Sequence, residues 1–425
     1  MVLLTLTLAC NVEERENPLA SPVFEVVGTR SGAADTFSGV AVAVSDVDHD
    51  GFEEVLVGQA SVDGRVALVD LATDSALVGY LAGADMKLGS AVAGGRDLDG
   101  DGVEDWLVGA PRDGTAGPGG GAAWLVPGGS TRGAIRNAGY RLYRTQYDEL
   151  GAGVALLGDV NGDGWNDLAV GAPGADGWHA GGGHVFVVAG PVTSSRHLGG
   201  EARIQGPPGA YIGRNIYDVG DMDGDGLADL ALAWPGSDNR AEDAGAVFLM
   251  FGGEFTGNQA VRQGSATLSG RLTGALVGSD VASDDVNGDG YLDLVVGAPG
   301  ERGWRGATYV VSGPVTSSQV LSSSVTARLT GHQGDDAFGS AVVGTGQGDV
   351  AVGAPGRKNG AGAVYLFQGP VTGVMRAGDA DVVVGGAGES LGASLAIAPG
   401  RNWIVAGAPT YGASDHGAVV LLEMP

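Results

Sequence analysis

The apolar residues of this chain fall in short runs separated by polar, glycine-rich segments. Such runs, bounded by Gly, Asn, Asp and Pro, are typical of β-strands joined by tight turns. Glycine accounts for 80 of the 425 residues, and beyond the N-terminal segment the longest stretch without one is 314–330. Because Gly destabilises a helix interior by about 1 kcal/mol relative to Ala, the pattern predicts an all-β protein.

Three markers recur in the same order seven times. The first is an apolar residue followed by Gly or a close variant, ending at Gly39, Gly89, Gly151, Gly213, Gly278, Gly339 and Gly392. The second is an apolar run ending in Gly-Ala-Pro or a variant, at residues 57–60, 109–111, 171–173, 233–235, 297–299, 353–355 and 407–409. The third is a Gly-led apolar strand, at residues 64–69, 121–126, 183–188, 245–251, 306–311, 362–367 and 417–422.

Each repeat is therefore predicted to contain a strand, a polar loop, a second strand, a hairpin, a third strand and a more variable fourth. A four-stranded sheet of this size cannot bury both faces alone, but seven packed radially can, which predicts a seven-bladed β-propeller. We expect one domain over residues 23–425, with blades that begin near residues 37, 87, 149, 211, 276, 337 and 390. An open, solenoid-like array of the same repeats is the alternative.

The last repeat runs out after its third strand, at Leu422, where only three residues remain. The missing fourth strand can come from Val23–Val27, which precedes the first repeat. Pairing of the two ends would close the ring and leave no exposed edge.

Acidic residues concentrate in the loop between the first two strands of five repeats. Each of these loops has nine places, with oxygen side chains at places one, three, five and nine and Gly at place six. The oxygen side chains are Asp46, Asp48, Asp50 and Glu54; Asp97, Asp99, Asp101 and Asp105; Asp159, Asn161, Asp163 and Asp167; Asp221, Asp223, Asp225 and Asp229; and Asp285, Asn287, Asp289 and Asp293.

This spacing predicts calcium sites, because Ca²⁺ takes six to eight hard oxygen ligands and the sharp turn at place six favours Gly. Place seven would add a backbone carbonyl, from Phe52, Val103, Trp165, Leu227 and Tyr291 in the five loops. The EF-hand is excluded, since place twelve is apolar in every loop where an EF-hand needs Glu. Simple Asp-Gly turns would explain one loop, but not five in register, and Mg²⁺ suits such loops less because it retains its waters.

The formal net charge is −27, which disfavours nucleic-acid partners. The ligand places of the five loops hold 18 of the 50 acidic residues. About five bound Ca²⁺ ions would relieve this repulsion and stabilise the native state alone, so we expect a structural role for them.

The N-terminus contains the only cysteine, Cys10, at the end of an apolar run. Residues 1–10 resemble the leader of a bacterial lipoprotein, in which this Cys is lipidated, and residues 11–22 would form a polar linker. An ordinary signal peptide and an incidental apolar start are the alternatives. We expect an exported protein that is outer-membrane anchored, periplasmic or extracellular, with a lipid anchor as its only contact with the membrane.

Together, the markers and the Asp-rich loops resemble the FG-GAP repeat proteins, whose best-known members are the N-terminal propellers of integrin α subunits. The resemblance covers residues 23–422 and rests on Phe37-Ser38-Gly39, Phe338-Gly339, the Gly-Ala-Pro tripeptides and the loops. It implies a seven-bladed propeller with Ca²⁺ in these loops and a role in adhesion or ligand recognition. Here the first five repeats hold the loop and the last two lack it, and no leg domains follow, so an integrin-like heterodimer is not implied.

The face opposite the loops would receive the hairpins between the second and third strands. Three of these carry aromatic residues that could bind a protein or a sugar, namely Trp178, Trp304 and Tyr411. The alternative is that each ring only covers its own hairpin.

These features favour a calcium-stabilised adhesion or binding module for a protein or polysaccharide partner over a calcium-dependent polysaccharide lyase or hydrolase. The sequence has no Gly-x-Ser-x-Gly elbow, no Cys/His nucleophile pair and no His-Glu-x-x-His motif, so we expect no enzymatic activity.

Overall fold

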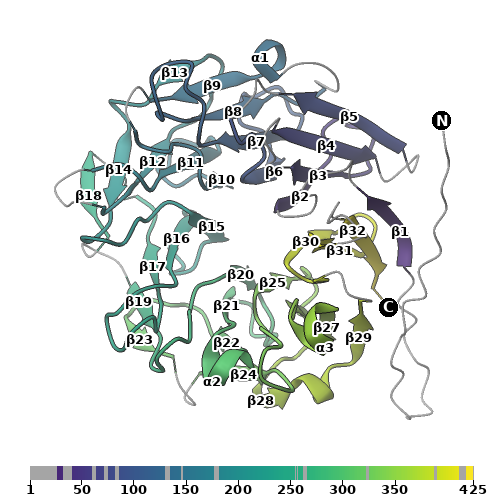
Figure 1. The fold of residues 1–425 in the computed structure, drawn as a ribbon. Helices are drawn as coiled ribbons and strands as arrows, with labels where there is room; N and C mark the ends of the chain where they lie inside the picture. The colour runs from purple at the N-terminus through teal and green to yellow at the C-terminus, as the bar shows by residue number, and fades with distance from the viewer. Residues whose placement is uncertain are drawn as a thin grey trace.

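The computed structural model describes residues 26–31, 41–59, 64–70, 75–81, 86–129, 135–144, 147–176, 181–253, 255, 257–261, 266–321, 325–386, 390–410 and 418–424. Seven sheets stand around a central axis, with the first strand of each repeat innermost (Figure 1). The chain is therefore a seven-bladed β-propeller, as the repeats predict.

The blades follow one another in chain order. Blades one to three comprise β2 (Ala41–Ser45), β3 (Glu54–Gln59), β4 (Arg65–Asp70) and β5 (Ser75–Leu81); β6 (Val92–Arg96), β7 (Asp105–Ala110), β8 (Ala122–Val126) and β9 (Tyr140–Tyr143); and β10 (Val154–Leu157), β11 (Asp167–Ala172), β12 (His184–Val188) and β14 (Ala202–Gln205). Blades four and five comprise β15 (Asn215–Gly220), β16 (Asp229–Trp234), β17 (Ala246–Met250) and β19 (Ala266–Ser269); and β20 (Val281–Asp284), β21 (Asp293–Ala298), β22 (Ala307–Val311) and β24 (Ala327–Thr330). Blades six and seven comprise β25 (Ala341–Gly344), β26 (Val350–Gly353), β27 (Ala363–Phe367) and β29 (Val382–Gly385); and β30 (Ser394–Ala398), β31 (Trp403–Ala408), β32 (Ala418–Glu423) and β1 (Val26–Ser31).

Every blade contains the four predicted strands, and four of the seven blades have a fifth strand that the sequence did not predict. In blades two to five, the segment between the third and fourth strands of the following blade adds a short parallel strand to the outer edge: β13 (Arg196–His197), β18 (Asn258–Ala260), β23 (Gln319–Val320) and β28 (Gly373–Arg376). An unpaired edge exposes N–H and C=O groups, and the neighbouring connection satisfies them. Each of these segments therefore links its own blade to the preceding one by parallel main-chain pairing, and we call the four of them strap strands.

Regular helix is confined to single turns in the described residues. These are α1 (Ile135–Ala138), α2 (Glu301–Trp304), α3 (Arg357–Gly360) and the 3₁₀ turn η1 (Ala377–Asp379). None of the described helices has the length and hydropathy of a bilayer-spanning segment.

The ring is closed by the N-terminal strand. β1 pairs antiparallel with β32, with Val26 opposite Leu422 and Ser31 opposite Ala418. Of the predicted segment Val23–Val27, the last two residues belong to β1, which continues to Ser31, and the first three lie outside the described residues. The second half of this edge strand is polar, which main-chain hydrogen bonding allows. A search for apolar runs therefore does not detect that half of the strand.

Buried apolar side chains lie between blades rather than within them. Seven clusters fill the seven interfaces, and the one between blades one and seven includes Val55, Val57, Val405 and Leu421. The second strand of a blade is covered on both faces, as the unbroken burial of β7, β11 and β21 shows. This explains why the Gly-Ala-Pro runs are apolar throughout instead of alternating.

The recurrent glycines lie where neighbouring blades meet backbone to backbone. In blade five, a Cβ added at Gly297 would lie 2.1 Å from the carbonyl oxygen of Gly339 in blade six. The amide of Gly339 in turn donates to the carbonyl of Gly353 in its own blade, at 2.9 Å. The marker glycines are therefore required by the close approach of two main chains.

Candidate functional site

The five acidic loops lie on one face of the propeller, because each connects the innermost strand of its blade to the second. Antiparallel pairing of the first three strands places the next hairpin of every blade on the opposite face. The loops therefore form an arc over blades one to five, as the sequence predicts.

Backbone amides fix the carboxylates of each loop. In blade two, Asp97 accepts hydrogen bonds from the amides of Gly100 at 2.7 Å and Gly102 at 2.8 Å, and Asp101 accepts from Val103 at 2.8 Å. Gly102 has φ +86°, a conformation that residues with a side chain rarely adopt. The equivalent bonds recur in blades three, four and five, so the turn holds the acids at places one and five in the same orientation each time.

The acids at places one, three and five converge in three loops. Their ligand oxygens all lie within 4.8 Å of one another in the groups Asp46, Asp48 and Asp50; Asp97, Asp99 and Asp101; and Asp221, Asp223 and Asp225. In blades three and five, place three is Asn, and its side-chain Nδ2 donates a hydrogen bond to the acid at place nine. The distances from Nδ2 to the carboxylate oxygen are 3.2 Å for Asn161 and Asp167 and 2.9 Å for Asn287 and Asp293. A cluster of hard oxygens around a tight turn fits a divalent cation of the Ca²⁺ type.

The acid at place nine is buried and holds the loop to the sheet. Asp105 is fully buried, and its two oxygens accept from the amide of Leu98 at 2.7 Å and from that of Gly128, after the third strand, at 2.8 Å. Asp167 and Asp229 make the same two bonds. In blades two to five the ninth-place acid therefore links the loop, the second strand and the exit of the third, whereas Glu54 of blade one accepts from the amide of Val47 in its loop at 2.9 Å.

Burial of these ninth-place carboxyls raises their pKa values, with the other loop acids adding to the effect. The pKa of Glu54 rises to about 8, that of Asp105 to about 7, and those of Asp167 and Asp229 to about 6. The pKa of Asp293 is raised for the same reason. A bound cation would favour the ionised form of all five groups.

Blade six retains one residue of the loop that the sequence comparison of repeats overlooked. Asp349 precedes β26 at the register of the ninth-place acids, and its Oδ1 accepts from the amide of Gly369 at 2.8 Å. The sequence could have revealed Asp349, because it precedes Gly-Ala-Pro by the same number of residues as the ninth-place acids do. Its presence in a blade without the other loop acids indicates that the ninth-place acid stabilises a blade in the absence of a metal ion.

The loops also contact one another around the ring. The indole of Trp165, at place seven in blade three, lies against Gly100 of the loop in blade two, where a Cβ would come within 2.8 Å of the ring. Asn166 donates to the carbonyl of Asp97 at 3.0 Å, and Arg401 of blade seven stacks on Phe52 at 4.2 Å. The geometry of each loop is therefore coupled to the packing of adjacent blades.

A hydrogen bond at place two repeats this coupling five times. The carbonyl at place two accepts from an amide of the following blade, in the pairs Val47 and Gly129, Leu98 and Val192, Val160 and Gly253, Met222 and Val315, and Val286 and Val371, at 2.6–2.9 Å.

Of the predicted ligand-binding aromatics, Trp304 is half exposed, at 49 %, on the turn α2 of the face opposite the loops. Trp178, Tyr411 and the predicted lipidation residue Cys10 lie outside the described residues, as do the leader and linker.

Comparisons with known proteins agree with this geometry. The FG-GAP repeat family matches residues 150–188 and 277–311, which run from the apolar-Gly marker to the third strand in blades three and five. The chain is 35 % identical to Integrin alpha-PS5 of Drosophila melanogaster over 159 residues, 33 % of this chain and 14 % of the relative. It is 32 % identical to Integrin alpha-V of Gallus gallus over 228 residues, 51 % of this chain and 20 % of the relative, and 28 % identical to Integrin alpha pat-2 of Caenorhabditis elegans over 257 residues, 56 % and 20 %.

The fold and its acidic loops thus define a β-propeller of the repeat type with candidate cation sites. More particularly, two of its blades match the FG-GAP repeat family, and the chain is similar to part of integrin alpha chains. It aligns with about a fifth or less of the length of these relatives.

Proposed function

We propose that this protein is a calcium-stabilised binding module that works outside the cytoplasm. The observation that carries the proposal is the recurrence of oxygen side chains at the same point of five successive blades, in three of which three carboxylates converge. Integrin alpha chains give a second, weaker support, because the resemblance covers only part of each of them.

Calcium would be held by the side chains at places one, three, five and nine and by the carbonyl at place seven. The acidic loops contact the next blade and in several cases each other, so an ion in one loop would stabilise the ring beyond its own blade. The ions have a structural role in this proposal, since protein oxygens fill the coordination that Ca²⁺ requires.

Thermal denaturation with EDTA and with Ca²⁺ tests the metal sites. We expect a higher midpoint in Ca²⁺, because a ligand that binds only the native state stabilises it by about 2.7 kcal/mol per site at a concentration 100 times its Kd. Mg²⁺ at the same concentration should raise the midpoint less. Equal midpoints in EDTA and Ca²⁺ would rule the sites out.

The partner would bind on the face opposite the acidic loops, where Trp304 is exposed. The sequence has Trp178 and Tyr411 between the second and third strands of blades three and seven. Protein and polysaccharide partners at the cell surface are both compatible with such loops. A polysaccharide panel assayed for products, with and without chelator, distinguishes binding from catalysis. Turnover by the purified propeller would contradict the assignment as a binding module.

Export with lipidation at Cys10 is part of the same proposal. Labelling of growing cells with a radioactive fatty acid should mark the wild-type protein and leave the Cys10→Ser variant unlabelled. Equal labelling of both would exclude Cys10 as the attachment point.

A further inference from the structure

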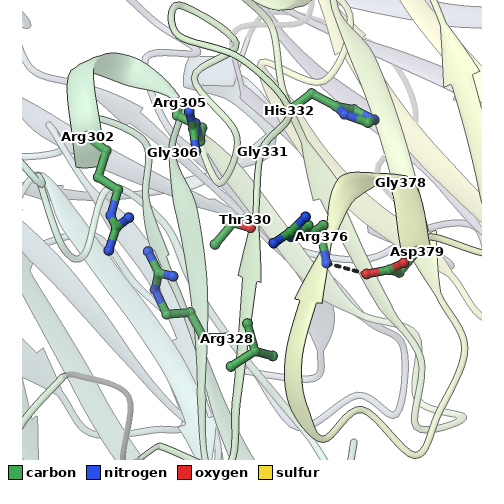
Figure 2. Close-up of a pocket in the computed structure, with 11 residues that line it drawn as sticks. Arg302, Arg305, Gly306, Arg328, Thr330, Gly331, His332, Arg376, Gly378 and Asp379 are labelled. Atoms are coloured by element: carbon green, nitrogen blue, oxygen red, sulfur yellow. Dashed lines mark hydrogen bonds between the residues drawn. The ribbon is translucent and has the colours of Figure 1, made fainter.

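A basic cavity lies on the outer part of blade five, on the face opposite the acidic loops (Figure 2). It measures about 490 Å³, within the range of small-ligand sites. Arg302, Arg305, Arg328 and Arg376 line it together with Thr330 and His332. Four guanidinium groups in one cavity are unexpected in a chain whose formal net charge is −27.

Three segments far apart in the sequence build this cavity. Arg302 and Arg305 come from the hairpin between the second and third strands of blade five. On β24, Arg328 and Thr330 point to the cavity while Leu329 between them is buried. β28, the strap from blade six, pairs with β24 in parallel and places Arg376 beside Thr330. His332 lies over Gly378, 3.3 Å from the position of a Cβ there.

The charges of the cavity are only partly neutralised. Glu301 is buried and pairs with Arg328 and, at 3.5 Å, with Arg302. The guanidinium groups of Arg305 and Arg376 form no ion pair with any residue that the structure describes. Asp379 accepts a hydrogen bond from the main-chain amide of Arg376 at 2.8 Å (Figure 2). The lining therefore keeps a net positive charge.

Blade two has the same architecture without this excess. Asp113 and Arg141 occupy the positions of Glu301 and Arg328 and are paired at 3.1 Å. The cavity beside them is lined by Trp124, Arg141 and Tyr143, with no second arginine. One acid–arginine pair is therefore enough to stabilise this part of blade two. The additional arginines of blade five have no equivalents in the lining of the blade-two cavity.

We infer that the cavity of blade five binds the carboxylate or sulfate group of an acidic sugar. Arginine forks match such oxyanions in two parallel hydrogen bonds, and Thr330 and His332 add donors for neighbouring oxygens. Among the lining side chains, only Val374 is aliphatic and only Asp379 is a carboxylate, so the cavity suits an anionic ligand better than a basic or apolar peptide side chain. The negative field of the whole chain repels long polyanions, so a short acidic saccharide fits better than an extended one.

This inference rests on the proposed binding function and names a ligand class for it. It is tested with Ca²⁺-loaded protein by calorimetric titration with glucuronate and glucose 6-sulfate, with glucose, inorganic sulfate and an Asp-rich peptide as further arms. The test variant is Arg305→Gln/Arg376→Gln. The matched control is Arg240→Gln/Arg271→Gln, which removes two exposed arginines from the equivalent region of blade four.

We expect the acidic sugars to bind the wild type and the control alike, and to bind the test variant at least about tenfold more weakly, since each charge-assisted hydrogen bond lost is worth about a factor of ten. Glucose should not bind. In the wild type, the ligand should also shift the NMR signal of the His332 imidazole, which locates the site without any substitution.

The inference is overturned if neither acidic sugar binds, if glucose binds as well as they do, or if the test variant binds them like the control. Binding of inorganic sulfate alone or of the acidic peptide in place of the sugars also overturns it. The Ca²⁺ effect on melting does not depend on these outcomes, so the two proposals fail separately.

Discussion

Arg96 of blade two forms an ion pair with Asp218 of blade four and so bridges the whole of blade three. The guanidinium passes Gly158 at the end of β10, where a Cβ would lie 3.6 Å from Nη1 of Arg96. A Cβ at this position would be in ordinary van der Waals contact with the guanidinium, and its nearest neighbour would be Cβ of Ala228, at 2.8 Å. Because each partner precedes an acidic loop, the pair joins the candidate cation sites of blades two and four.

Removal of this bridge should weaken the cooperativity between blades. The side chains of Arg96 and Asp218 are 33 % and 19 % exposed, so solvent screens the pair and we expect a coupling energy of about 1 kcal/mol. A double-mutant cycle with Arg96→Met and Asp218→Asn, followed by urea denaturation in 0.1 M and 1 M salt, measures it. Additive effects of the two substitutions would mean that the pair contributes nothing to stability.

Calcium dependence should follow the individual loops. Asp225→Ala removes an exposed ligand at place five of blade four, so we expect it to lose about 2.7 kcal/mol of the stabilisation at a Ca²⁺ concentration 100 times the Kd, with little change in EDTA. Asp349→Ala, in blade six, should instead cost about 1 kcal/mol in both conditions, because it leaves the amide of Gly369 without its acceptor. A Ca²⁺-dependent effect of Asp349→Ala would assign blade six a metal site.

The contact between blades five and six should not accept a methyl group. Gly297→Ala places a Cβ 2.1 Å from the carbonyl oxygen of Gly339, and we expect a loss of about 3 kcal/mol in the free energy of unfolding. Gly200→Ala is the matched control, since nothing lies within 4 Å of its Cβ and its φ is not positive. Chemical denaturation compares the two, and similar stabilities would show that the blades can separate at this point without cost.

Buried His184 should make stability depend on pH. Burial, with the nearby charges of Arg203 and Arg144, lowers the pKa of its imidazole from 6.5 to about 4. Below pH 6.5 the imidazole becomes protonated in the unfolded chain, whereas in the native state it stays neutral until about pH 4. The native state therefore loses stability as the pH falls through this window, by about 3 kcal/mol in total from this group.

Denaturation curves at pH 7, 5.5 and 4 for the wild type and His184→Leu test this dependence. The difference in stability between the two proteins should shrink or reverse as the pH falls, because the variant carries no titrating group in that place. Parallel pH profiles would show that the imidazole titrates alike in the native and unfolded states.

Much of the architecture could be predicted from local pattern. The seven repeats, the strands ending in Gly-Ala-Pro and the position of every acidic loop follow from residue spacing, because a hairpin of fixed length repeats the same turn each time. Closure by the N-terminus followed from counting strands. The strand continues past the predicted end at Val27 to Ser31, because the polar part of an edge strand carries no apolar signal.

The tertiary structure alone decided which distant residues meet. The strap strands and the bridge from Arg96 to Asp218 join segments that are distant in the chain, and no local pattern marks the residues that meet. The basic cavity of blade five is the clearest case, since its arginines are unremarkable in the sequence at 302, 305, 328 and 376. They form a site only because β28, in the connection between β27 and β29 of blade six, pairs with β24 of blade five. Each acidic loop, by contrast, is complete within nine consecutive residues.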